Sequence, residues 1–226
     1  MVSIDNVYQK VLAFANKEQR GYITPQEFNL FAHQAQLEIF EQYFYDLNQF
    51  LRLPGNSEEY SNIVNNLREK IVVFERTGTI NSGVIIPSTG DTLYRLGTIT
   101  QNGVIVEEIQ RDDNPYIQSS PLLASSALRP TYIRSGVLSV IMTPNINAIC
   151  TYVRLPRAPR WGYFVLSGNA LHDASTAKTT NFELHPSEES ELVYKILKYA
   201  GASMKREDVS RVGGALESQQ IQQEKQ

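Results

Sequence analysis

The chain has 226 residues, 42% of them hydrophobic, which is enough to bury a core as one domain with appendages or as two small domains. The formal net charge of -3 excludes a generally basic nucleic-acid-binding protein, but not a local basic patch. The single cysteine, Cys150, excludes an internal disulfide framework and is typical of a reducing compartment. Its neighbours indicate a strand, so we expect a buried, unreactive thiol.

Hydrophobic segments and the first residues give expectations about location. No stretch approaches the roughly 20 apolar residues that span a bilayer. The start, MVSIDNVYQK, lacks the basic and then apolar layout of a signal peptide. We therefore expect a soluble protein, made in the cytoplasm, that does not associate with a membrane.

The strongest helical pattern covers residues 24–53. Thr24 is a suitable N-cap, Pro25 suits the first helical position, Glu27 completes a capping box, and Pro54 predicts the end. We expect one apolar seam to pack inside the chain and a second apolar set to contact other subunits; the alternative is a central helix buried on most sides of one domain. The seam comprises Leu30, His33, Leu37, Phe40, Phe44, Leu47 and Leu51, and the second set Phe28, Ile39, Tyr43 and Phe50.

Two shorter helical patterns accompany the long one in the first third of the chain. Residues 4–19 predict a helix that Ser3 or Asp5 could cap, and residues 57–72 predict another. Because the connections are short, residues 1–72 should form an up-and-down helical bundle.

Residues 73–184 change to a strand-like pattern. They are rich in Val, Ile, Thr and Tyr and are punctuated by Gly, Pro and Asn, which indicates short strands. The Asn-Gly pair at 102–103 is a strong signal for a two-residue hairpin, and polar loops are expected at 111–121 and 167–181. We predict a central antiparallel β domain, and therefore the α+β class.

The C-terminal part returns to a helical pattern. The His-Pro start near His185 and the following carboxylates predict a helix over 185–203 that returns to the bundle. Gly213 and Gly214 should then break a last helical segment. Residues 204–226 have little to bury, so we expect an extended tail that docks on a partner.

The residues that commonly carry chemistry do not form a known motif. His33, His172 and His185 lie in three segments without a metal-ligand spacing, and there is no phosphate loop or GxSxG elbow. We therefore predict no catalytic residue, no metal, no cofactor and no enzyme activity. The alternative is a hydrolase that uses Asp112, Asp113 or His172.

The segment RLPRAPRW is the most concentrated polar and aromatic feature. Its arginines and tryptophan suit a protein interface and, as an alternative, a nucleic-acid contact. Its two prolines indicate an extended arm. The predicted interface residues are Ile39, Tyr43, Phe50, Arg154, Arg157, Arg160, Trp161, Leu216 and Ile221.

Four stretches together resemble a family of virion structural proteins of tailed bacteriophages, including crAss-like phages and marine podoviruses. They begin ANKEQRGYITPQEF at residue 15, NSEEYSNIV at 56, TYVRLPRAPRW at 151 and FELHPSEESELV at 182. The likeness is one of sequence texture over residues 15–203 and includes no catalytic motif.

The resemblance implies a neck protein, also called an adaptor or head-to-tail connector, located in the virion. Such a protein forms a homo-oligomeric ring, here expected to be a dodecamer, that contacts the portal and neighbouring neck and tail proteins. Genomic DNA passes through its channel without sequence recognition. On this chain the segment that reaches the portal would be 203–226. The β region is longer than in simple adaptors, so a lower tail ring, a decoration protein or a cargo protein remain alternatives.

Overall fold

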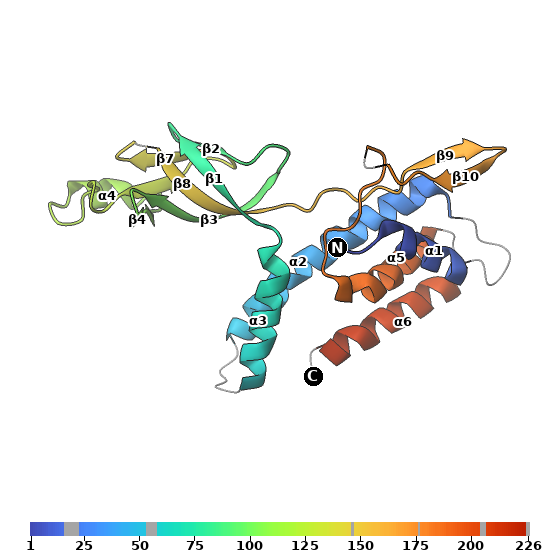
Figure 1. Ribbon diagram of the computed structural model, residues 1–226. Coiled ribbons are helices and arrows are strands. Elements are labelled where there is room, and N and C mark those ends of the chain that lie inside the picture. Colours follow the sequence, from blue (N-terminus) through green and yellow to red (C-terminus); the bar gives the residue numbers. More distant parts are fainter. Residues whose placement is uncertain (16–22, 53–57, 146, 176, 204–206, 225–226) are drawn as a thin grey trace. The chain divides into compact units, whose positions relative to one another are not determined.

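The chain divides into two compact units, one inserted into the other in sequence (Figure 1). Met1–Val73 and Pro156–Gln226 form the helical unit, and Phe74–Leu155 form the β unit. The computed structural model describes residues 1–15, 23–52, 58–145, 147–175, 177–203 and 207–224. The expected α+β class is confirmed, because the chain contains both long helices and antiparallel sheets.

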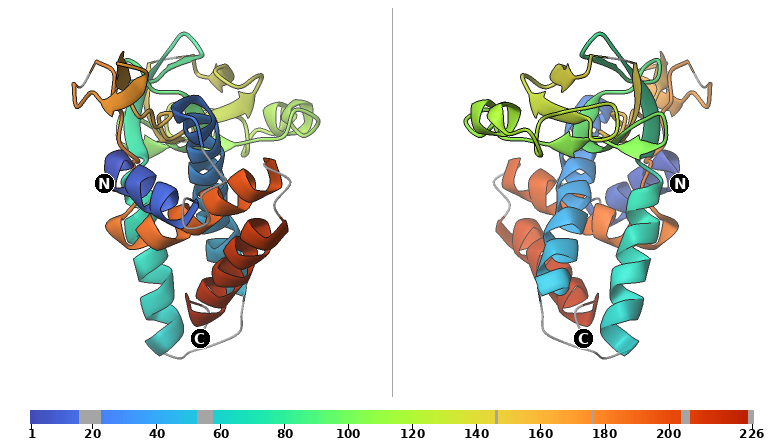
Figure 2. Two further views of the ribbon diagram at one scale, coloured as in Figure 1. Left: turned by 90° about the vertical axis from the view of Figure 1, so that its right-hand side faces the viewer. Right: turned by 90° about the vertical axis from the view of Figure 1, so that its left-hand side faces the viewer.

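Helices α1, α2, α3, α5 and α6 make up most of the helical unit. Helix α5 packs against α1, α2 and α6, and α3 packs against α2 (Figure 2). The bounds are α1 Ile4–Ala15, α2 Pro25–Arg52, α3 Glu58–Val72, the short 3₁₀ helix η2 Pro186–Glu188, α5 Glu189–Ser203 and α6 Glu207–Glu224; a hairpin of β9 Tyr163–Leu166 and β10 Asn169–His172 completes the unit.

Helix α2 begins as its sequence predicts. The Thr24 nitrogen donates to Glu27 Oε2 at 3.0 Å, and the Glu27 nitrogen donates to Thr24 Oγ1 at 3.2 Å. The Thr24 hydroxyl also donates to Glu27 Oε2, at 2.7 Å, and this bond, followed by that from the Thr24 nitrogen, lowers the pKa of the Glu27 carboxyl. The capping box is therefore confirmed, whereas the stop predicted at Pro54 lies outside the described residues.

The buried face of α2 matches the predicted seam only in part. Phe40 and Phe44 of the seam are buried as predicted, but Leu30 and Leu51 are 71% and 56% exposed. Ile39 and Tyr43, predicted to contact other subunits, are 1% and 4% exposed. Lys70 of α3 lies over the Tyr43 ring, 5.5 Å from its centroid. The prediction for Ile39 and Tyr43 was wrong, and so was that for Phe28, which is 0% exposed, because other parts of the same chain cover all three.

Helix α6 runs through Gly213 and Gly214, so the predicted break is wrong. A Cβ at Gly213 would lie 3.0 Å from the backbone nitrogen of Lys198, so this glycine allows α6 to approach α5 closely. Glu217 of α6 also pairs with Lys195 at 2.6 Å. Helix α6 thus packs on its own chain, and its docking on a partner stays a prediction.

The β unit consists of a five-stranded sheet, ordered β2-β1-β8-β3-β4, and a three-stranded sheet, ordered β5-β6-β7. All pairs are antiparallel except β5 with β6. The Asn102–Gly103 hairpin is confirmed, with φ of 51° and 81° at the two turn residues. The bounds are β1 Glu75–Asn81, β2 Val84–Ile86, β3 Leu93–Gln101, β4 Val104–Ile105, β5 Glu107–Glu108, α4 Asn114–Ser119, β6 Thr131–Arg134, β7 Val140–Thr143 and β8 Ala148–Arg154.

The core of the β unit lies between these two sheets. Ile80, Ile99 and Tyr152 of the five-stranded sheet pack with Met142 of the three-stranded sheet. Cys150 is 0% exposed in this cluster, and burial raises the pKa of its thiol, as expected for an unreactive cysteine.

The predicted end of the β domain at residue 184 is wrong. The β unit ends at Leu155, and the strands β9 and β10 belong to the helical unit. Gln36 of α2 holds the returning chain, because its Nε2 donates to the Arg157 carbonyl at 2.8 Å and its Oε1 accepts from the Glu183 nitrogen at 3.0 Å. A strand pattern in the sequence does not reveal which unit the strand packs on.

Candidate interaction site around Trp161

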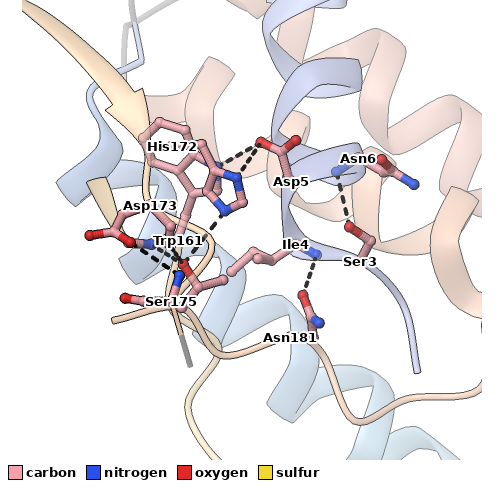
Figure 3. A network of polar contacts seen from close by, with 11 residues as sticks. Ser3, Ile4, Asp5, Asn6, Trp161, His172, Asp173, Ser175 and Asn181 are labelled. Atoms are coloured by element: carbon pink, nitrogen blue, oxygen red, sulfur yellow. Dashed lines mark hydrogen bonds and ion pairs between the residues drawn. The ribbon is translucent and has the colours of Figure 1, made fainter. Parts of the chain in front are cut away.

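Trp161 is the centre of an aromatic and polar cluster in the helical unit (Figure 3). Its side chain is 2% exposed, and its Nε1 donates to Asp5 Oδ1 at 2.9 Å. The indole stacks with Tyr163 and His172 at centroid distances of 5.9 and 5.5 Å, and Tyr8 contacts it at 4.3 Å. Trp161 therefore joins α1 to both strands of the β9–β10 hairpin.

The first turn of α1 is capped by other residues, which leaves the Asp5 carboxylate available to Trp161. Ser3 Oγ accepts from the Asn6 nitrogen at 3.5 Å. Asn181 Oδ1 accepts from the Ile4 nitrogen at 3.1 Å, so a residue distant in sequence completes the cap. The two capping contacts and the indole contact together fix the start of α1 beside Trp161.

The backbone around Trp161 is held as firmly as its side chain. The Trp161 nitrogen donates to Asn29 Oδ1 at 2.7 Å, and Asn29 Nδ2 donates to the Trp161 carbonyl at 3.3 Å. The Gly162 nitrogen donates to Thr179 Oγ1 at 3.1 Å. A Cβ at Gly162 would lie 2.7 Å from the Lys178 carbonyl carbon, so only glycine fits there. The segment forms a rigid base for the hairpin.

One face of the β9–β10 hairpin rests on this base at Tyr163 and His172, although Val165 of the same face is 64% exposed, and the opposite face is exposed and apolar. Tyr163 pairs with His172, and both side chains stack on Trp161. One residue further along each strand, Phe164 pairs with Leu171, so these side chains lie on the opposite face. We define the outer face as Phe164, Leu166 and Leu171, which are 45%, 59% and 42% exposed.

Sequence reasoning missed this hairpin, because it placed a polar loop over 167–181. Ser167 and Gly168 form the two-residue turn with φ of 51° and 85°, the same geometry as at Asn102–Gly103. A Ser-Gly pair between two short apolar runs was the available signal.

The alternative of a hydrolase based on His172 is not supported by the geometry. His172 Nδ1 lies 3.8 Å from Asp5 Oδ1, which is beyond hydrogen-bond distance, and its Nε2 lies 3.5 Å from Thr179 Oγ1. That hydroxyl donates to the Asp173 carbonyl, so it is not activated by the imidazole. In the described part of the chain, no group of three or more His, Cys, Asp or Glu residues could hold a metal ion.

Besides Ile39 and Tyr43, two further predicted interface residues, Arg154 and Trp161, lie inside the chain. Arg154 is 4% exposed in the β unit, where its Nε lies 3.9 Å from Asp91 Oδ1 and its guanidinium lies over the Phe74 ring. Its prediction as an interface residue was wrong, because these groups of the β unit cover it. Trp161 is also buried, so it could support an interface through the hairpin but does not present its own surface.

Four of the predicted interface residues are at least partly accessible. Arg157 and Arg160 are exposed, and Phe50 and Leu216 are half-buried. Arg160 lines a groove of about 380 Å³ with Asn29, Trp161 and Lys178. The side chain of Ile221 lies outside the described residues.

Comparison with models of protein families and with curated proteins gives no match for this chain. Across the described residues, no helix is long and apolar enough to cross a bilayer.

Proposed function

We propose that the protein is a structural subunit of a bacteriophage neck or tail ring, which joins the portal to the tail and forms part of the DNA channel. The observation that carries this proposal is the apolar outer face of the β9–β10 hairpin, mounted on Trp161. The sequence resemblance over residues 15–203 supplies the phage context.

The hairpin suits assembly better than any role within one chain. A two-stranded hairpin alone is marginally stable in water, and here only its inner face is supported by Trp161. Phe164, Leu166 and Leu171 lie together on the other face, and contiguous exposed apolar side chains of this kind mark protein contacts. A rigid base keeps the ordering entropy of docking low.

The charge of the chain is consistent with a channel. A net charge of -3 gives no general attraction to DNA phosphates, so a double helix could slide through a ring of such subunits without being held. Under this proposal the partners are other copies, the portal and neighbouring tail proteins, and DNA is contacted without sequence recognition.

The mass and symmetry of the purified full chain test this proposal. Light scattering and negative-stain imaging should show a closed cyclic ring, and Leu166→Asp should dissociate it. The matched control Leu122→Asp changes an equally apolar side chain, 91% exposed in the β unit, and should leave the ring intact. A chain that stays monomeric both alone and with the portal would overturn the proposal. A virion copy number equal to that of the capsomers would favour a decoration protein instead.

A further inference from the structure

A pocket of about 380 Å³ lies in the helical unit between α2, α3 and η2. Phe50 of α2 and Ile63 and Leu67 of α3 form apolar walls, and Asp46 and Glu69 supply carboxylates. Sites for small molecules measure roughly 300–1,000 Å³, so this pocket has room for one long side chain but not for a helix. We call it the α2–α3 pocket.

The charges around the α2–α3 pocket favour a cation. Asp46, Glu69 and Lys70 line the pocket, and Glu188 beside it pairs with Lys70. With His185 of the lining counted as neutral, three carboxylates and one ammonium group leave a net charge of -2. The pocket therefore attracts a positively charged group.

Glu188 gives a second indication that a hydrogen-bond donor is missing. Its side chain is 1% exposed, and its Oε1 accepts from Ser187 Oγ and pairs with Lys70. Its Oε2 has no hydrogen-bond partner among the described residues, although buried carboxylate oxygens normally have one. Ser187 and Lys70 both line the pocket, so Oε2 lies next to it. A guanidinium, with several N–H donors, suits such a group of carboxylate oxygens.

Arg160 carries a guanidinium that its own chain does not use. The side chain is exposed, and among the described residues it has no hydrogen-bond or ion-pair partner. Its backbone is fixed, because it exchanges two hydrogen bonds of 2.9 and 2.8 Å with Thr180, and Asn29 holds the next residue, Trp161. A fixed backbone reduces the entropy that docking costs.

Arg160 and the α2–α3 pocket lie near opposite ends of α2. Arg160 shares a groove with Asn29 in the first turns of the helix, whereas Asp46 lies in its last turns. At about 1.5 Å per residue, Asn29 and Asp46 are about 25 Å apart, a distance that no side chain spans. Arg160 therefore cannot enter the pocket of its own chain, but it can enter that of a second copy.

We propose that Arg160 of one copy binds in the α2–α3 pocket of the next copy. There the guanidinium pairs with Asp46 and Glu69, and the aliphatic stem packs on Phe50. This inference rests on the proposed function, because it names a contact that builds the ring, and Arg160 adjoins the hairpin proposed for assembly. The two surfaces differ from each other, so the contact is heterologous and can repeat around a ring.

The groove that Arg160 lines offers a competing arrangement. Lys178 lines it too, so an acidic group of a neighbouring copy could bind there instead. Lys178 already pairs with Asp173 at 2.8 Å, which leaves Arg160 as the unbalanced charge and favours its use outward. The two arrangements differ in whether Glu69 or Lys178 takes part in the contact.

Charge reversal in the full chain tests the contact, with Arg160→Glu, Glu69→Lys and the double variant. Both side chains are exposed, so each change should leave the fold intact, with circular dichroism as the check. Each single variant should weaken self-association by at least about tenfold, because an attraction becomes a repulsion. In the double variant opposite charges meet again, so association should be at least about tenfold tighter than the product of the two single losses predicts. If Arg160→Glu does not fold, Arg160→Ala takes its place.

Sedimentation velocity measures the association of each variant. The matched control Arg111→Glu changes an exposed arginine of the β unit and should associate like wild type. Losses that simply multiply in the double variant, beside a wild-type ring, would overturn this inference and leave the ring proposal standing. Equal losses in Lys178→Glu and Arg160→Glu, with none in Glu69→Lys, would overturn it in favour of an acidic group in the groove. A wild-type chain that never self-associates would overturn both proposals.

Discussion

The indole nitrogen of Trp161 donates to the Asp5 carboxylate at 2.9 Å, although 156 positions separate the two residues in sequence. The contact fastens the first turn of α1 to the segment that leads into β9. The beginning of the chain and the base of the hairpin are thus held at one point, and the outer face depends on that point for its rigidity.

Replacement of Trp161 by phenylalanine should loosen the hairpin without unfolding the chain. Phenylalanine keeps one aromatic ring but lacks the second ring of the indole and its N–H donor, so lost packing and the lost hydrogen bond to Asp5 together should lower the free energy of unfolding by about 2–3 kcal/mol. Urea denaturation measures the loss, and hydrogen exchange should become faster in β9 and β10. The control Asp5→Asn keeps an acceptor for the indole and should cost less; an equal or larger cost would contradict this account.

The adjacent glycines of α6 should respond in opposite ways to alanine. Gly213 faces the Lys198 nitrogen at 3.0 Å and the Tyr194 carbonyl at 3.1 Å, so Gly213→Ala should push α6 from α5 and destabilise the chain. Nothing lies within 4 Å of a Cβ at Gly214, so Gly214→Ala should stabilise the helix by about 0.5–1 kcal/mol. Thermal unfolding of both variants checks the pair, and equal shifts would show that α6 does not pack as described.

The contact between α5 and α6 should weaken in acid. Burial opposes ionisation of Glu217, but its hydrogen bonds from Lys195 and Lys198 prevail and lower the pKa of its carboxyl below the usual 4.5. A lowered folded-state pKa gives stability that is present above about pH 4.5 and is lost as pH falls through the lowered value. Stability curves from pH 6 to 3 should therefore be flatter for Glu217→Gln.

The control for the acid experiment is Glu189→Gln. Glu189 pairs with Lys10 at 2.7 Å, but the two side chains are 30% and 53% exposed, so the pair should contribute little to stability.

At the other extreme of pH, burial opposes the charge on Lys195, yet its carboxylate partners raise the pKa of its amine above 10.5. The stability that the Lys195 ion pairs contribute is therefore present below that pH and is lost only as pH rises through the raised pKa.

Identical stability curves from pH 6 to 3 for wild type and Glu217→Gln would contradict the assignment of the acid effect to Glu217.

Gln36 should be the most sensitive polar residue of α2. It is 0% exposed, and Gln36→Leu would leave the Arg157 carbonyl and the Glu183 nitrogen without this partner. We expect a loss of about 2–4 kcal/mol in the free energy of unfolding, measured by urea denaturation. The exposed neighbour Gln34 gives the matched control, and Gln34→Leu should change stability by less than about 0.5 kcal/mol. Similar losses for both would argue against the described path of the returning chain.

Local features of this fold could be predicted from the sequence. The Thr24–Glu27 capping box and the Asn102–Gly103 hairpin each depend on residues within four positions of one another. Their chemistry is complete without the rest of the chain, so sequence reasoning found both.

Features that depend on distant segments could not be predicted. Which face of α2 is buried depends on partners such as Lys70, Arg157 and Glu183. The apolar residues of α2 lie around most of the helix, so their spacing does not indicate one buried face. The site was recognised only in part for the same reason. The pattern RLPRAPRW singled out Trp161, but its contact with Asp5 and the hairpin it supports appear only in the folded chain.

The two ends of the β unit lie side by side, because the Arg154 nitrogen donates to the Phe74 carbonyl at 3.0 Å and Glu75 pairs with Val153. Residues 74–155 therefore constitute a cassette whose ends a short glycine-rich linker could bridge. Such a deletion would let the helical host be purified without its insert, and the same junction could accept a foreign module or a fluorescent reporter.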